Sequence, residues 1–136
     1  MSHHAYASHY RQTSVTSAVL DADPHRLVAL TFAGIRNRLR LAIACIENGN
    51  VARKGEAISE TSALVGHLDG SLDHEAGGEI AGNLSSLYHY IQRRLVEANV
   101  GNDASILQEC DSLVAELEGA WNAIAPNAAP ARSAAG

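Results

Sequence analysis

The residues best suited to chemistry in this sequence are seven histidines, two cysteines and fifteen aspartates and glutamates. Helical bundles that hold two metal ions do so with Glu-x-x-His pairs that face the core. The sequence contains no Glu-x-x-His, and no two of its histidines stand four residues apart. His3, His4 and His9 lie close together, but a polar N-terminal stretch offers a metal no fixed geometry. We therefore expect neither a metal site nor a cofactor.

One further histidine could carry a phosphoryl group. The run His67-Leu68-Asp69-Gly70-Ser71 is similar to the His-x-x-Lys-Gly segment of histidine phosphotransfer domains, which are also four-helix bundles. The lysine is missing, and the glycine comes one residue early. The simpler interpretation is an exposed helical histidine. A histidine phosphotransfer bundle acting through His67 is the alternative function that the sequence leaves open.

Nucleophilic and phosphate-binding sites are also hard to build from these residues. No serine or cysteine has a plausible base close to it in the sequence. The pair Gly77-Gly78 lacks the following Lys-Ser/Thr and the preceding strand of a phosphate-binding loop. Cys45 and Cys110 both fall in apolar helical patterns, which predicts two buried free thiols and not a disulfide. The sequence thus predicts a protein that is not an enzyme.

Length and charge limit the remaining classes of function. A chain of 136 residues corresponds to one domain. Its net charge of −5 disfavours binding to the backbone of a nucleic acid. No apolar run approaches the roughly 20 residues that cross a bilayer. The first residues also lack the apolar core of a signal peptide. We expect a cytoplasmic protein without membrane insertion.

The elements that must position any site are helices, because apolar residues recur at the helical period and strand signals are nearly absent. Short connections make consecutive helices antiparallel. The expected fold is all-α, an antiparallel up-down-up-down four-helix bundle with a short N-terminal helix or capping segment. The helices are expected at about residues 24–48, 51–72, 78–99 and 103–124. Asp23 is expected to cap the first helix, and Asn102 or Asp103 the fourth.

Composition divides the chain into three parts. Residues 1–16 are polar and lack a strong period, which predicts a flexible N-terminal segment. Residues 17–124 form the helical bundle domain. Residues 125–136 consist mainly of Ala, Pro, Ser and Gly, which predicts a disordered C-terminal tail.

Charge is divided between the first and fourth helices. The first carries four arginines against one glutamate, and the fourth carries five acidic residues with no Lys or Arg. Opposite charges would meet if the two helices were neighbours, as in a square bundle. Each such pair at the surface contributes at most about 1 kcal/mol, so the charges are expected to orient the helices more than to stabilise them.

The first helix has more apolar residues than one core face needs. Its main apolar face consists of Val28, Thr31, Phe32, Ile35, Leu39, Ala42, Ile43 and Ile46. A second stripe lies about 80° or more away from the centre of the first. It consists of Leu27, Leu30, Gly34, Leu41 and Cys45, with Arg38 within it, and Tyr90 on the third helix is similarly off its core face. We interpret this stripe as a groove for an amphipathic partner helix. Burial under a tail or at a dimer contact is the simpler alternative.

A family resemblance rests on residues 72–90, which read LDHEAGGEIAGNLSSLYHY. This run resembles the LDxExGGEIAxNLxxLYxY signature of the flagellar secretion chaperones of the FliS type. Asp23-Pro24-His25-Arg26-Leu27 is similar to the SPxxLI helix start of that family. Shorter matches in the same order are Tyr10 with residues 15–18, residues 47–56, Arg93-Arg94-Leu95, Ala98-Asn99, Asn102-Asp103 and Ala120-Trp121. The resemblance covers about residues 6–124. It departs at Ala33, where the family usually has Asp, and at His89, which replaces a common Asp.

The resemblance implies a function that the residues alone do not. Members of the family bind the C-terminal segment of flagellin, which is disordered alone and folds into helices around the chaperone. The bound flagellin cannot polymerise early and is delivered to the cytoplasmic domain of the flagellar export gate membrane protein. Tyr10 is implied to cover part of the groove and to take part in docking at the gate. An anti-sigma factor, a flagellin assembly regulator and a second copy of the chain are further partners left open.

Overall fold

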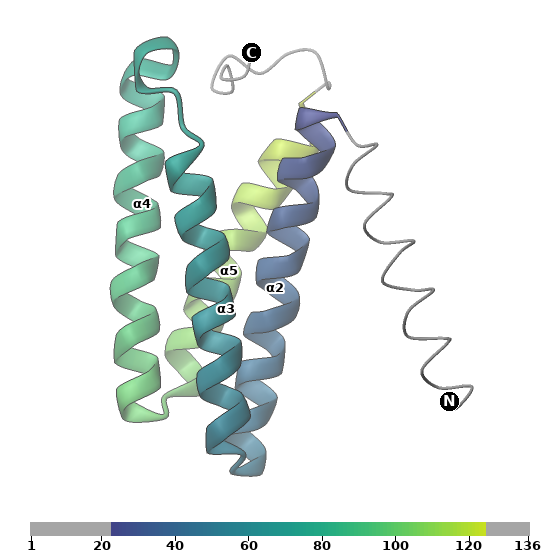
Figure 1. Ribbon diagram of the computed structural model, residues 1–136, viewed down its shortest axis with the longest axis vertical. Coiled ribbons are helices and arrows are strands. Elements are labelled where there is room, and N and C mark those ends of the chain that lie inside the picture. Colours follow the sequence, from purple (N-terminus) through teal and green to yellow (C-terminus); the bar gives the residue numbers. More distant parts are fainter. Residues whose placement is uncertain (1–22, 125–136) are drawn as a thin grey trace, which may run out of the picture.

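The computed structural model describes residues 23–124, and this part of the chain folds into four α-helices without a strand. Figure 1 shows an antiparallel up-down-up-down bundle, which confirms the predicted fold class. The predicted end segments 1–16 and 125–136, and the expected short N-terminal helix, lie outside the described residues. The helices are α2 (Pro24–Asn48), α3 (Val51–Gly70), α4 (His74–Gly101) and α5 (Ala104–Asn122). Each is too polar for its length to serve as a membrane span.

The bounds of α2 follow from its end residues and are those predicted. The side chain of Asp23 accepts a hydrogen bond from the backbone N–H of Arg26 at 2.7 Å. Pro24 suits the first helical position because its missing N–H would have no helical partner there. Gly49 ends the helix with a left-handed φ of 73°, which a glycine adopts without steric strain.

The connection between α3 and α4 corrects the predicted boundary. We expected the second helix to continue to about residue 72 and the chain to turn at Gly77-Gly78. Instead α3 ends at Gly70, and Asp73 caps α4 by accepting a hydrogen bond from the N–H of Ala76 at 3.0 Å. Gly78, with φ of 51° and ψ of −125°, breaks the helical geometry inside α4. A capped turn at residues 74–77 therefore precedes the break at Gly78, and the long part of α4 begins after this glycine, close to the predicted start.

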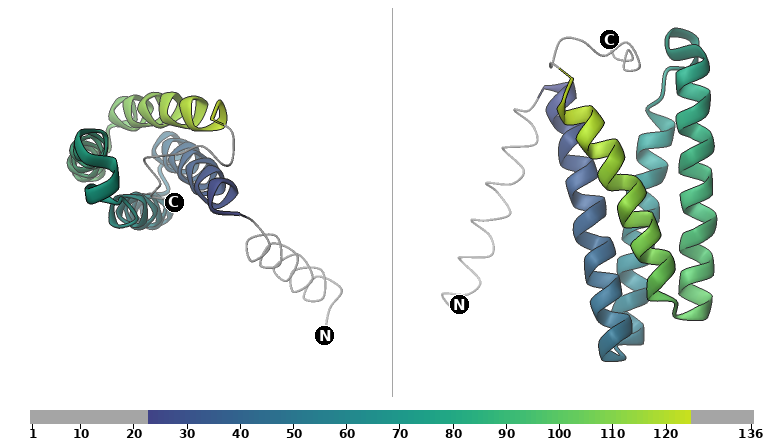
Figure 2. Two further views of the ribbon diagram at one scale, coloured as in Figure 1. Left: turned by 90° about the horizontal axis from the view of Figure 1, so that it is seen from above. Right: turned by 180° about the vertical axis from the view of Figure 1, so that it is seen from behind.

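The four helices are not packed with equal closeness. The contacts that α2 makes with α3 and α5 are more extensive than the contacts that α4 makes with the same two helices. Figure 2 shows why: α5 runs diagonally, close to α4 at the α4–α5 turn and beside α2 at its own C-terminal end. The first turns of α4 and the last turns of α5 are consequently left apart.

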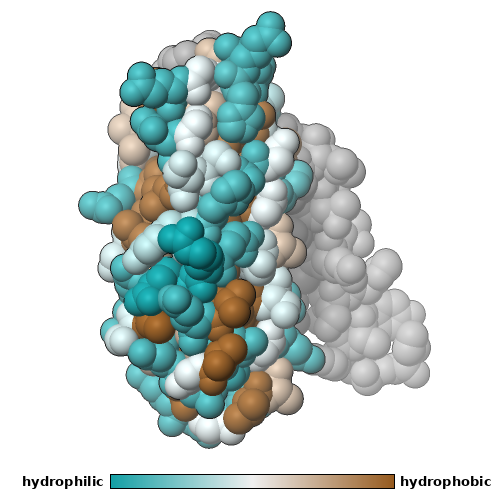
Figure 3. Space-filling view, turned by 90° about the vertical axis from the view of Figure 1, so that its left-hand side faces the viewer, coloured by the Kyte–Doolittle hydropathy of each residue, from teal (hydrophilic) through white to brown (hydrophobic). Residues whose placement is uncertain are grey.

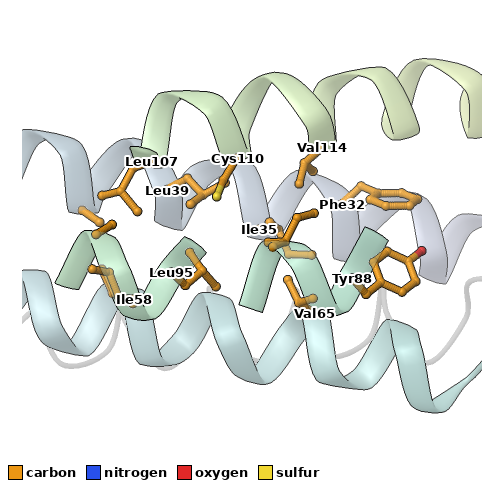
Figure 4. Close-up of a cluster of buried hydrophobic side chains, with 14 of the residues drawn as sticks. Phe32, Ile35, Leu39, Ile58, Val65, Tyr88, Leu95, Leu107, Cys110 and Val114 are labelled. Atoms are coloured by element: carbon orange, nitrogen blue, oxygen red, sulfur yellow. The ribbon is translucent and has the colours of Figure 1, made fainter. Parts of the chain in front are cut away.

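The core consists mainly of residues that the helical period placed inward, although Ile80 on α4, which the period also placed inward, is 58% exposed. Figure 4 shows the central side chains of all four helices pointing toward one another. Cys45 on α2 is buried, as predicted for a free thiol. Lys54 and Ala57 on α3 and Ala81 on α4 are buried as well, although the period did not place them inward. The largest fully buried side chains are Ile35, Leu39, Ile91, Leu95, Leu107, Val65, Val114, Thr61 and Cys110.

Opposite charges meet between α2 and α5, as predicted. The guanidinium of Arg36 donates to both carboxylate oxygens of Asp111, at 2.9 and 3.2 Å, and to Glu118 at 3.0 Å. The pKa of Arg36 is raised mainly by these hydrogen bonds, first to Asp111 and then to Glu118. The two-pronged geometry fixes the relative rotation of the two helices more firmly than a single ion pair would.

Candidate functional site

An apolar pocket of about 400 Å³ opens at the end of the bundle where α2 begins, α3 ends, α4 begins and α5 ends. We call this the open end. All four helices contribute to the pocket because their ends diverge here (Figure 2). The lining residues are Pro24, Val28, Phe32, Leu68, Ser71, Leu72, Ile80, Leu84, Tyr88, Leu117, Ala120, Trp121 and Ile124.

The wall of the pocket carries almost no polar groups. Ser71 and Tyr88 supply hydroxyls, and Trp121 supplies an indole N–H. Burial raises the pKa of Tyr88 from its ordinary value of 10.0 to about 12, and the charge of Asp69 adds to this shift. The phenol of Tyr88 is therefore neutral at physiological pH, and no lining residue carries a charge. Such a wall suits apolar side chains of a partner and offers nothing to hold a charged ligand.

Two residues at the rim tie α2 to α5. The ring of His25 stacks on the indole of Trp121, with centroids 4.9 Å apart and planes 15° from parallel. The Nε2 atom of His25 lies 3.0 Å from the carbonyl oxygen of Trp121, and the indole N–H donates to the carbonyl oxygen of His25 at 2.9 Å. We call this reciprocal contact the His25–Trp121 clasp. Sequence reasoning placed Trp121 inward but gave His25 no role.

The predicted second stripe of α2 is split by the structure. Leu27 and Leu41 are exposed, and Leu30 is half-buried. Gly34 faces α3, because a Cβ built there would lie 3.6 Å from the Cδ1 of Leu64. The leucines thus remain available to a partner, whereas the glycine allows a close approach between two helices of the same chain.

Arg38, within the same stripe, is also bound inside the chain. Its guanidinium lies 3.4 Å from a carboxylate oxygen of Glu60 on α3 and donates to the carbonyl oxygen of Gly34 at 3.3 Å. Arg38 therefore borders the outer contact between α2 and α3.

The placement of Cys45 on the exposed stripe is wrong. Its side chain is only 6% exposed. The error has a geometric cause: α3 packs against α2 on the side to which the stripe turns, so a residue near the edge of the core face is covered. Cys45 and Cys110 are both free thiols, as predicted. Burial raises the pKa of Cys110 to about 11, which makes it a poor nucleophile.

Tyr90 lies off the core face, as expected, but its hydroxyl is engaged within the chain. It donates to a carboxylate oxygen of Glu109 on α5 at 2.7 Å, and the guanidinium of Arg93 lies over its ring at 5.5 Å. Arg94 donates to the other oxygen of Glu109 at 2.8 Å. Hydrogen bonds from Tyr90 and Arg94 lower the pKa of Glu109. These residues join α4 to α5. Tyr10 lies outside the described residues.

The residues considered for chemistry are not brought together. His67 is exposed on α3, which agrees with its interpretation as a surface histidine. Between residues 23 and 124, the structure forms no group of three or more His, Cys, Asp or Glu side chains that could hold a metal ion.

A third apolar surface lies on the outward face of α4. Val96 and Val100 are 63% and 82% exposed. Figure 3 shows apolar side chains gathered low on this side of the molecule, away from the open end. Neither valine lines the pocket, so this surface is a separate feature of the bundle.

The pocket was missed because its large apolar residues were assigned to the core, one helix at a time. Phe32, Leu84, Tyr88, Leu117 and Trp121 all follow the helical period. That the helix ends diverge and leave a pocket between these residues depends on how α5 crosses the bundle. A usable signal was the excess of large apolar residues close to the predicted helix ends, at Leu72 and Ile124.

Known proteins with similar sequences agree on one family. The sequence profile of the family described as Flagellar protein FliS matches residues 4–128. The flagellar secretion chaperone FliS of Salmonella typhimurium is 44% identical over 120 residues, covering 88% of this chain and 89% of that protein. The flagellar secretion chaperone FliSB of Pseudomonas aeruginosa is 43% identical over 115 residues, covering 85% and 91%. FliS of Bacillus subtilis is 31% identical over 112 residues, covering 82% and 80%.

Proposed function

The chain belongs to the FliS family of flagellar secretion chaperones, and from this premise we propose that it binds the C-terminal segment of flagellin in the cytoplasm. By covering that segment it prevents premature polymerisation. It then delivers the flagellin to the cytoplasmic domain of the flagellar export gate membrane protein.

The apolar pocket at the open end is the observation that carries the proposal. Its uncharged wall and its volume of about 400 Å³ suit several large apolar side chains presented by an amphipathic helix. When a partner covers such an exposed apolar surface, the free energy of the system falls. Ordering a disordered partner segment costs about 2–5 kcal/mol or more, which the burial of this apolar surface offsets.

A second contact area for the same partner lies along α2. Leu27 is close to the pocket, since Pro24 and Val28 line it. Leu41 lies 14 residues further along the same helix, a rise of about 21 Å. With half-buried Leu30 between them, these side chains form a discontinuous apolar line beside the contact between α2 and α3. A long segment that wraps around the bundle could contact both the pocket and this line.

Docking at the export gate is proposed for the N-terminal segment, on the basis of the family resemblance at Tyr10. A Tyr10→Ala variant is expected to keep the affinity for flagellin but to weaken binding of the complex to the cytoplasmic domain of the gate. Titration of that domain with the two complexes measures the difference. Equal affinities would remove Tyr10 from the docking site.

The pocket can be tested with a pair of alanines that are both exposed. Ala120 lines the pocket, whereas Ala63 lies on the outer face of α3. Ala120→Arg places a charge at the apolar mouth and is expected to weaken binding of the flagellin C-terminal segment by about tenfold or more. Ala63→Arg carries the same added charge and should bind like the wild type. Isothermal titration calorimetry distinguishes the two. Equal affinities for both variants would contradict the proposal.

A further inference from the structure

The His25–Trp121 clasp lies at the point where α5 ends, and helix ends have carbonyl groups without helical partners. The carbonyl oxygen of Trp121 is one of these. It accepts a hydrogen bond from the N–H of Ile124 at 3.1 Å and lies 3.0 Å from the Nε2 of His25. Both lone pairs of this oxygen are therefore used, and one of the two partners comes from another helix.

The contacts of the clasp require a proton on one particular nitrogen of the imidazole. A carbonyl oxygen can only accept a hydrogen bond, so the Nε2 of His25 must carry the proton. Both the neutral ring with a proton on Nε2 and the imidazolium meet this condition. In return, the indole Nε1 donates to the carbonyl oxygen of His25 at 2.9 Å. The indole is thus held by the stacking contact and by its own hydrogen bond, while the imidazole N–H holds the backbone of the last turn of α5.

Only one of the two rings of the clasp forms part of the pocket wall. Trp121 lines the pocket, and His25 does not. The imidazole covers one part of the indole and leaves the rest to form the pocket wall. Trp121 belongs to the last turn of α5, which ends at Asn122, and last turns fray readily without an anchor. The clasp supplies that anchor from α2.

We propose that His25 is a positioning residue, which holds the indole of Trp121 in place as a rigid wall against which an apolar side chain of the flagellin segment packs. This inference rests on the proposed function. Tryptophans that are already ordered before binding lose little entropy on contact, and they are frequent among the residues that dominate binding energy. Without the imidazole, the indole loses its stacking partner and the last turn of α5 loses its anchor, so only the hydrogen bond to the backbone carbonyl of residue 25 still positions this wall of the pocket.

The test uses the full-length protein and variants that remove parts of the clasp separately. His25→Ala removes the ring and the N–H. His25→Gln keeps an N–H donor at a similar reach, and His25→Phe keeps the ring without the donor. His67→Ala, at an exposed histidine on α3, is the matched control. Three measurements apply to each protein: affinity for the flagellin C-terminal segment, affinity for the apolar dye anilinonaphthalene sulfonate, and acrylamide quenching of fluorescence. Trp121 is the only tryptophan in the chain, so fluorescence reports on it alone.

We expect His25→Ala to weaken binding of the flagellin segment about tenfold, while the bundle remains folded. Dye binding should weaken and quenching should increase, because the indole loses the imidazole that stacks on it and the last turn of α5 loses its hydrogen bond to α2. His25→Gln should recover affinity to within about threefold of the wild type. His67→Ala should match the wild type in all three measurements.

Several results would overturn the inference. One is a folded His25→Ala protein with wild-type affinities and wild-type quenching. Another is a His25→Gln protein no better than His25→Ala, since the N–H would then be irrelevant. If His25→Ala fails to fold, His25→Phe decides: full binding and unchanged quenching contradict a role for the hydrogen bond. If the wild type binds the dye but not the flagellin segment, the proposed function fails, while dye affinity and quenching still decide the role of His25.

Discussion

The two ends of this bundle are built in different ways. At the end with the α2–α3 and α4–α5 turns, the buried Lys54 donates to the carbonyl oxygen of Asn99 at 2.9 Å and to the side chain of Asn102 at 2.6 Å. We call this the tied end. At the open end, no such polar contact joins α3 or α4 to α5 among the pocket-lining residues, and Ile80 is left 58% exposed.

The difference shows how one small fold can be both stable and ready to bind. At the tied end, an ammonium satisfies a carbonyl at the C-terminus of α4, where the helix dipole also favours a positive charge. This fixes the spacing of α3 and α4 without large side chains. At the open end the helices diverge, and their apolar side chains line a pocket of about 400 Å³. Stability is therefore concentrated at one end and binding surface at the other.

The largest difference in the free energy of unfolding is expected between two variants of α5, each with one leucine replaced at a different end of the helix. Leu107 is fully buried toward the tied end, whereas Leu117 is half-buried and lines the pocket. Leu107→Ala should lower the free energy of unfolding by about 2–5 kcal/mol, since it leaves a cavity in a packed core. Leu117→Ala should lower it by about 1 kcal/mol, because less apolar area is lost from burial. Urea denaturation measures both. Equal losses would mean that the two ends are packed alike.

The second largest effect is expected at the tied end, where Lys54 contacts Asn99 and Asn102. Lys54→Met keeps the apolar stem but leaves the carbonyl of Asn99 and the amide of Asn102 without their donor. The expected loss is about 1–3 kcal/mol of unfolding free energy. Flagellin binding should change little, because the pocket is at the other end of the bundle. A variant as stable as the wild type, or one with strongly impaired binding, would contradict the division of roles.

Alkaline pH should lower the free energy of unfolding through Tyr88, which lines the pocket at the open end. The folded protein raises the pKa of this phenol to about 12, above its ordinary value of 10.0, so its neutral form is favoured by folding. The associated stability is fully present below pH 10 and is lost as the pH rises toward 12. A shift of this size corresponds to roughly 3 kcal/mol at most. Tyr88→Phe should lose less stability than the wild type between pH 9 and pH 11 in denaturation experiments. Parallel losses in the two proteins would argue against burial of the hydroxyl.

The smallest effect is expected on the outward face of α4. Val96→Ser and Val100→Ser change exposed side chains outside both ends, so unfolding free energy should shift by no more than about 0.5 kcal/mol. Affinity for the flagellin segment should match that of the wild type. A marked loss of affinity would show that the binding surface extends beyond the open end.

Much of the fold could be predicted because its signals are local. Asp23, Gly49 and Asp103 mark helix ends by their own chemistry, and the helical period identified most of the core. The errors arose where helices meet. Cys45 was predicted to be buried as a thiol but was also placed on the second stripe, and only the position of α3 against α2 decides between the two. Asp73 was placed at the end of one helix, although it caps the next.

The site was less predictable for the same reason. The exposed leucines of α2 were identified, but Arg38 and Gly34 serve the contact between α2 and α3. The pocket depends on the diagonal course of α5, and the His25–Trp121 clasp joins residues 96 positions apart. Contacts of this kind are set by tertiary packing, which a single sequence does not display.

The most direct test of the account is to locate the bound flagellin segment on the bundle by methyl NMR. The unlabelled C-terminal segment is titrated into protein with labelled Ile, Leu and Val methyl groups. The account predicts large shift changes for Leu72, Leu84 and Leu117 at the open end, and none for Leu107 toward the tied end. Changes centred on Leu107, with an unperturbed open end, would contradict it.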